Sequence, residues 1–75
     1  MQTLDALPLG QSCRVVDIYP QAQLARRIVG LGLMPGTKIT ALHKSISGAA
    51  IAYRIRGAVV ALRREDAKNI SVQML

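Results

Sequence analysis

Few side chains in this sequence could catalyse a reaction. The chain has one histidine, one cysteine and four carboxylates, which are His43, Cys13, Asp5, Asp17, Glu65 and Asp66. Glu65 and Asp66 are adjacent in a stretch with helical character, so their side chains point in different directions and do not flank one substrate. No nucleophile, base and orienting acid follow a recognisable catalytic pattern. The sequence therefore predicts a binding protein and not an enzyme.

His43 is the one weak candidate for binding a metal ion. The chain has no C-x-x-C or H-x-x-x-H pair, so it does not assemble a closed structural zinc site by itself. His43 falls at the predicted end of a strand, where we expect it to be exposed. There it could bind a divalent ion weakly or share one between two molecules. We therefore expect no resident cofactor, and at most a weak or intermolecular divalent metal.

The formal net charge of +6 makes nucleic acid, an anionic membrane surface and an acidic protein face candidate partners. No apolar stretch reaches the ~20 residues that span a bilayer, and no secretory signal opens the sequence. The lone Cys13 excludes an internal disulfide, which suits a reducing compartment. We predict a cytoplasmic protein without membrane insertion, and one domain over residues 1–75.

The first regular elements are a strand and a helix. Residues 13–19 (CRVVDIY) are rich in β-branched side chains, which favour a strand. Pro20 suits the first position of a helix, and Leu24, Ile28 and Leu31 then form one apolar stripe at i, i+4 and i+7. Before them, Thr3 is expected to cap a short turn that gathers three leucines, Leu4, Leu7 and Leu9.

The second half predicts strands. Pro35-Gly36 is typical of a type II turn, because proline presets the first corner and glycine accepts a positive φ at the second. Alternating apolar and polar residues predict strands at 37–43 and 50–56. Gly57 then reverses the chain into a strand at 58–63, and a helical turn at 64–69 precedes a last short strand at 71–75. The fold class is mainly β. We expect a small five-stranded barrel with an amphipathic helix after the first strand and a short helical turn before the last.

Several segments together resemble the FeoA family. They are residues 26–37 (RRIVGLGLMPGT), 53–57 (YRIRG) and 61–67 (ALRREDA), in the family's order. The resemblance implies an SH3-like barrel. It also implies a small cytosolic accessory or regulatory protein of bacterial ferrous iron uptake, which acts on FeoB, a membrane transporter with a cytosolic GTP-binding domain. Monomer and weak homo-oligomer both stay open.

The turn after the predicted helix is the expected contact with that partner. Leu33, Met34 and Pro35 form an apolar cluster there, and Arg26 and Arg27 flank it. We expect these five residues to bind the transporter.

Two other functions stay open. A basic nucleic-acid-binding barrel is one, since Arg54 and Arg56 share a face of their strand, but a chain with two tyrosines and no other aromatic offers little for bases to stack on. A metal-sensing module of the FeoA type is the other.

Overall fold

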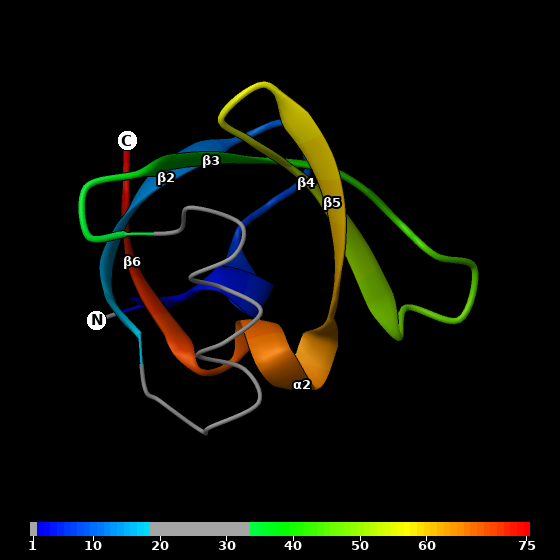
Figure 1. Cartoon of the computed structure of the whole chain (residues 1–75). Helices are drawn as coiled ribbons and strands as arrows, with labels where there is room; N and C mark the ends of the chain where they lie inside the picture. The colour runs from blue at the N-terminus through cyan, green and yellow to red at the C-terminus, as the bar shows by residue number, and fades with distance from the viewer. Residues whose placement is uncertain (1, 19–33) are drawn as a thin grey trace.

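The computed structural model describes residues 2–18 and 34–75, which form one antiparallel sheet of six strands (Figure 1). The order in the sheet is β1-β6-β2-β3-β4-β5. The elements along the chain are β1 (Gln2–Thr3), the 3₁₀ helix η1 (Leu4–Ala6), β2 (Ser12–Ile18), β3 (Lys38–Lys44), β4 (Ala50–Ile55), β5 (Ala58–Arg63), the helix α2 (Arg64–Ala67) and β6 (Ile70–Met74). The mainly β fold class is confirmed.

The inner face of the curved sheet carries the core. Along β4 the side chains of Ile51, Tyr53 and Ile55 are buried and that of Arg54 is exposed, as the alternation predicts. The buried residues from the other elements are mostly aliphatic; they are Leu4, Leu7, Cys13, Val15, Ile39, Ala41, Leu62, Ala67, Ile70 and Val72. Leu9, expected to join Leu4 and Leu7, is instead 47% exposed.

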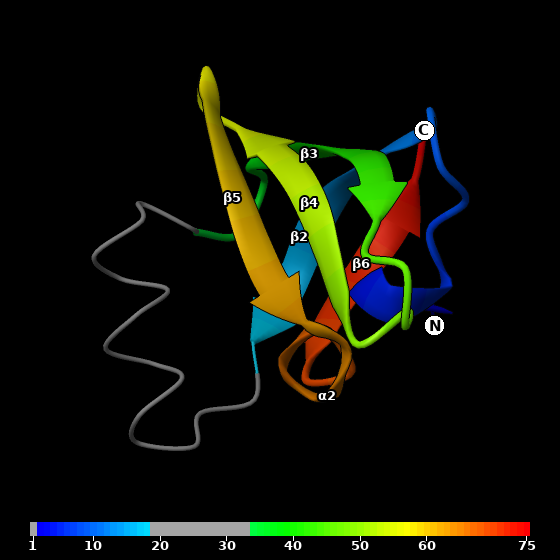
Figure 2. The same cartoon turned by 90° about the vertical axis from the view of Figure 1, so that its right-hand side faces the viewer.

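Two irregularities bend the sheet over this core. The register of β2 against β6 shifts between Val15 and Asp17, and that of β3 against β4 shifts between Ala41 and His43. An extra residue on one strand increases its local twist and bends it. The bends wrap β3, β4 and β5 around one side of the core (Figure 2).

The prediction of a closed barrel was wrong, and so was the count of five strands. The sheet ends at β1 and β5, which do not pair with each other. Helical turns cover the core at this opening, since α2 packs against both β5 and η1. The Tyr53 hydroxyl, from β4, donates a buried hydrogen bond of 3.3 Å to the carbonyl oxygen of Leu4 in η1. The additional strand, β1, has two residues and pairs with β6.

Helical structure also differs in its placement. The predicted helix after the first strand falls on residues outside the described ranges. Within those ranges, helix occurs at η1 and at α2, and α2 confirms the short helical turn expected before the last strand. None of the helices in the described part of the chain is long and apolar enough to cross a membrane.

Candidate docking surface

The Pro35-Gly36 segment forms the expected type II turn. The backbone N–H of Thr37 donates to the carbonyl oxygen of Met34 at 3.0 Å, and Gly36 has a φ of 89°. The Thr37 hydroxyl oxygen accepts a second bond, from the Met34 N–H, at 3.1 Å. A residue with a side chain would be strained at the Gly36 conformation, so the glycine is required by the turn.

Strand β2 holds this turn in place. The Gly36 N–H donates to the Val15 carbonyl at 2.7 Å, and the Val15 N–H donates to the Thr37 carbonyl at 3.0 Å. The exposed side chain of Arg14 in β2 also contributes, since its guanidinium donates to the Gly36 carbonyl oxygen at 3.1 Å. The turn is therefore tied to the sheet by backbone and side-chain bonds on both sides of Gly36.

The structure describes two of the five residues predicted to dock a partner. The Met34 side chain is 62% exposed, and Pro35 beside it is also exposed. Arg26, Arg27 and Leu33 lie outside the described residues. The described part of the predicted surface is thus an exposed apolar pair on a well-anchored turn.

A feature that the sequence reasoning missed adjoins this turn. An open groove of about 520 Å³ runs over the outer face of β3 and β4, and we call it the basic groove. Its lining residues are Thr37, Lys38, Thr40, Arg54, Arg56 and Gly57. The sequence indicated that Arg54 and Arg56 share a face, but it did not show that a third cation, Lys38, joins them.

Strand register brings these cations together. Thr40 lies opposite Arg54 on β4, and Ile39 lies opposite Ile55. Lys38 precedes Ile39 and Arg56 follows Ile55, and both residues line the groove. Arg56 and Gly57 form the two-residue turn between β4 and β5, with φ values of 52° and 81°, as a type I′ hairpin requires.

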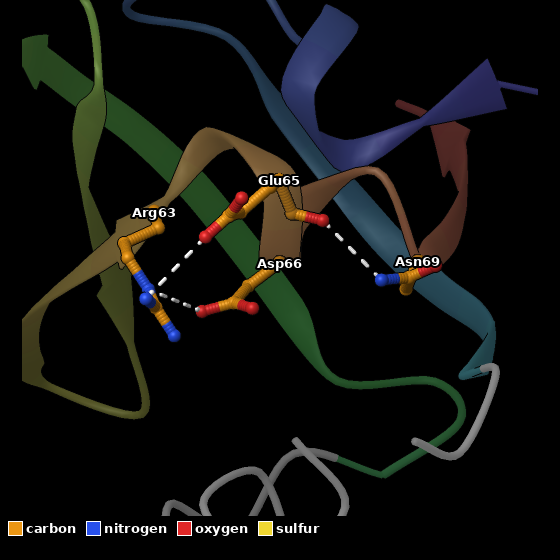
Figure 3. Close-up of polar contacts among 4 residues, drawn as sticks. All are labelled: Arg63, Glu65, Asp66 and Asn69. Atoms are coloured by element: carbon orange, nitrogen blue, oxygen red, sulfur yellow. Dashed lines mark hydrogen bonds and ion pairs between the residues drawn. The ribbon is translucent and has the colours of Figure 1, made fainter. Parts of the chain in front are cut away.

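At the end of β5 next to α2, an arginine pairs with two carboxylates (Figure 3). The Arg63 guanidinium lies 3.3 Å from a carboxylate oxygen of Glu65, and its Nε donates to Asp66 at 3.3 Å. The Asn69 amide donates to the Glu65 carbonyl oxygen at 3.2 Å. Arg63, Glu65 and Asp66 therefore form a small ion-pair network at the start of α2.

The two reactive groups of the interior are kept protonated. Burial raises the pKa of the Cys13 thiol to about 11, so at neutral pH the thiol is protonated and a poor nucleophile. Burial also raises the pKa of Tyr53, and the nearby Asp5 adds to that shift.

His43 is exposed in β3, as expected for a strand end. Across residues 2–18 and 34–75, no three side chains of histidine, cysteine, aspartate or glutamate gather as a metal site would require.

A comparison with protein families decides the relationship. The FeoA domain model matches residues 2–74. The chain belongs to the FeoA family. The resemblance of the three sequence segments is thereby confirmed. The curated relative Fe(2+) transport protein A of Campylobacter jejuni is 27% identical over 73 residues, which cover 97% of this chain and 99% of the relative. The family is associated with ferrous iron transport.

Solved FeoA structures share the fold. A FeoA-like protein from Clostridium acetobutylicum is 33% identical, with a TM-score of 0.88 over 97% of this chain and 85% of that one. A FeoA of Stenotrophomonas maltophilia, solved as a zinc complex and described as an SH3 domain protein, is 27% identical, with a TM-score of 0.83 over 97% of this chain and 91% of that one. The SH3-like character of the fold is therefore confirmed.

Proposed function

We propose that this chain is an accessory protein of bacterial ferrous iron uptake that binds the cytosolic GTP-binding domain of a FeoB-type membrane transporter. Membership of the FeoA family carries the proposal. The chain works in the cytoplasm and regulates its partner by binding, with no resident cofactor. Its single thiol, buried and protonated, supports a role without catalysis.

The contact on this chain is formed by Leu33, Met34 and Pro35, with Arg26 and Arg27 at its border. The described part of this surface supports that assignment. Met34 projects from a turn that several hydrogen bonds hold against β2, so little conformational entropy is lost when a partner covers it. Methionine adapts its shape to an apolar pocket, which suits it to a protein contact.

A triple variant tests this proposal. Arg26→Glu, Arg27→Glu and Met34→Ser together should abolish binding to the purified cytosolic domain of the transporter, measured by isothermal titration calorimetry. The matched control is Lys44→Glu, Lys68→Glu and Ile46→Ser, which makes the same change in charge and apolarity at three exposed positions elsewhere. This control should bind as the wild type does.

A folded triple variant that retains wild-type affinity would exclude the contact. If the wild-type chain itself shows no affinity for the transporter domain, with and without guanine nucleotide, the proposed partnership is wrong. Circular dichroism and thermal unfolding of each variant establish that the fold is intact before binding is compared.

A further inference from the structure

We propose that the basic groove binds an acidic segment of a protein partner, with carboxylates between its cations and apolar side chains against Met34 and Val59. This inference deepens the proposed function, on which it rests for the partner being a protein. It adds a second contact region, formed by the outer face of β3 and β4 next to the Pro35-Gly36 turn.

The basic groove concentrates positive charge. The lining residues that the structure describes include three cations, Lys38, Arg54 and Arg56, and no carboxylate. Within the described part of the chain, the side chains of Lys38 and Arg54 form neither a hydrogen bond nor an ion pair. Arg14 adds a further cation beside Lys38, since the two are partners across β2 and β3. Like charges on neighbouring strands destabilise a sheet, so an anion bound here would remove a repulsion as well as form contacts.

The groove also offers donors in a suitable arrangement for carboxylates. A guanidinium such as that of Arg54 presents paired N–H groups that match a carboxylate. The Thr37 hydroxyl oxygen accepts the Met34 N–H at 3.1 Å, which leaves its own O–H free to donate. Thr40 shares a hydrogen bond of 2.8 Å with Ser12, which fixes its hydroxyl on the groove floor.

Exposed apolar side chains border the cations. Val59 is 61% exposed and lies opposite Arg54 on β5, so both side chains are on the same face of the sheet. Met34 is 62% exposed and lies on the turn that leads into the groove at Thr37. A positive centre between apolar contacts is complementary to an acidic peptide with apolar flanks.

Nucleic acid fits the same surface less well. Proteins that bind single strands combine cations with aromatic side chains on which bases stack. Among the residues that the structure describes, the one aromatic side chain is that of Tyr53, which is buried. The observations therefore favour a protein segment.

Peptide titration followed by NMR tests the proposal. The probe is a blocked LEDEL peptide, with LQNQL as its uncharged counterpart, added to the ¹⁵N-labelled full chain. We expect LEDEL to shift the amide signals of residues 37–40 and 54–59, and LQNQL to leave them unchanged. The double variant Lys38→Gln and Arg54→Gln should weaken binding of LEDEL at least about tenfold, because two charge-assisted contacts are lost. The control double variant Lys44→Gln and Lys68→Gln should bind within about twofold of wild type, since rim charges contribute little.

Several results would overturn the proposal. They are equal binding of LQNQL, an unchanged affinity in the Lys38 and Arg54 double variant, or shifts confined to other residues. Tighter binding of a short oligothymidine would assign the groove to nucleic acid. Binding of inorganic phosphate as tight as that of LEDEL would assign it to a small anion.

Binding measurements with the transporter domain distinguish a failure of this inference from a failure of the proposed function. If LEDEL binds in the groove but the domain does not bind the chain, the proposed function fails and the groove assignment stands. If the domain binds wild type and the groove variant equally, the proposed function stands and the groove is not its contact.

Discussion

The two ends of the β4–β5 hairpin use arginine in opposite ways. At the α2 end, Arg63 lies 3.3 Å from carboxylate oxygens of both Glu65 and Asp66. At the turn end, Arg54 lies with Lys38 in a groove whose described lining residues include no carboxylate. The charge of Arg63 is therefore balanced within the chain, and its ion pairs link β5 to α2. Lys38 and Arg54 form no such ion pair with the residues that the structure describes, so their charge stays exposed at this end of the hairpin.

Burial on the inner face explains why the chain tolerates the repulsion in the groove. Ile39 and Ile55 are cross-strand partners that point into the core. A slip of one residue would turn both outward, so the register that gathers the cations is imposed by the apolar face.

The largest predicted effect contrasts two residues of β5. Leu62, near α2, is fully buried, and Val59, beside the groove, is 61% exposed. Leu62→Ala should lower the free energy of unfolding by about 2–5 kcal/mol, through lost burial and the cavity left behind. Val59→Ala should change it by less than about 0.5 kcal/mol. Urea denaturation measures both, and a similar loss for Val59→Ala would mean that this end of β5 is structural too.

Alkaline pH tests the protonated interior. In the unfolded chain the Cys13 thiol titrates near its ordinary pKa of 9.0, and burial raises the pKa to about 11 in the folded chain. The stabilisation is therefore complete below pH 9 and is lost as the pH rises from 9 towards 11, because the unfolded state releases its proton first. The loss should reach about 2–3 kcal/mol over this window.

The variant Cys13→Ala isolates that contribution. Its unfolding free energy should fall less steeply between pH about 8 and about 10.5 than that of wild type, with Tyr53 accounting for part of the remaining slope. The readout is the slope and not the stability itself, which the smaller side chain lowers at every pH. Identical slopes would show that the thiol does not titrate with unfolding.

The smallest predicted effect compares the arginines themselves. Arg63→Gln removes exposed ion pairs and should lower the free energy of unfolding by no more than about 1 kcal/mol. Arg54→Gln removes a repulsion, and should leave stability unchanged or raise it by about 0.2–0.5 kcal/mol. Thermal unfolding at low and high salt measures both, and added salt should shrink each difference. A loss on Arg54→Gln as large as that on Arg63→Gln would contradict the distinction between the two ends.

Local patterns were enough to predict most of the strands and turns. Alternation along residues 50–55 identified β4 with its buried face, and Pro35-Gly36 identified a turn whose chemistry admits few other conformations. The family resemblance rested on the same local segments. Met34, which the sequence places on that turn, is 62% exposed.

Features that depend on pairing between distant segments were not predictable in this way. Strand β1 has only two residues, and its definition as a strand depends on its pairing with β6. The sheet stays open because its two edge strands, β1 and β5, do not pair with each other. The pattern within one segment does not indicate which strands will be neighbours. The basic groove needs Lys38 of β3 beside two arginines that come from β4 and its turn, and their spacing in sequence carries no periodic signal. Only the register of β3 against β4 reveals it.

The pairing of β6 has a consequence for how the chain acquires its fold during synthesis. β2 finds most of its partners on β6, from Cys13 opposite Met74 to Ile18 opposite Ile70. A ribosome synthesises β2 well before β6, so the apolar side chains of Cys13 and Val15 lack part of their cover until β6 has emerged. The β4–β5 hairpin, with its two-residue turn, can form as soon as it emerges. The sheet can therefore close over this part of the core only after β6 has left the ribosome, and until then the nascent chain exposes apolar surface that holdase chaperones are suited to protect.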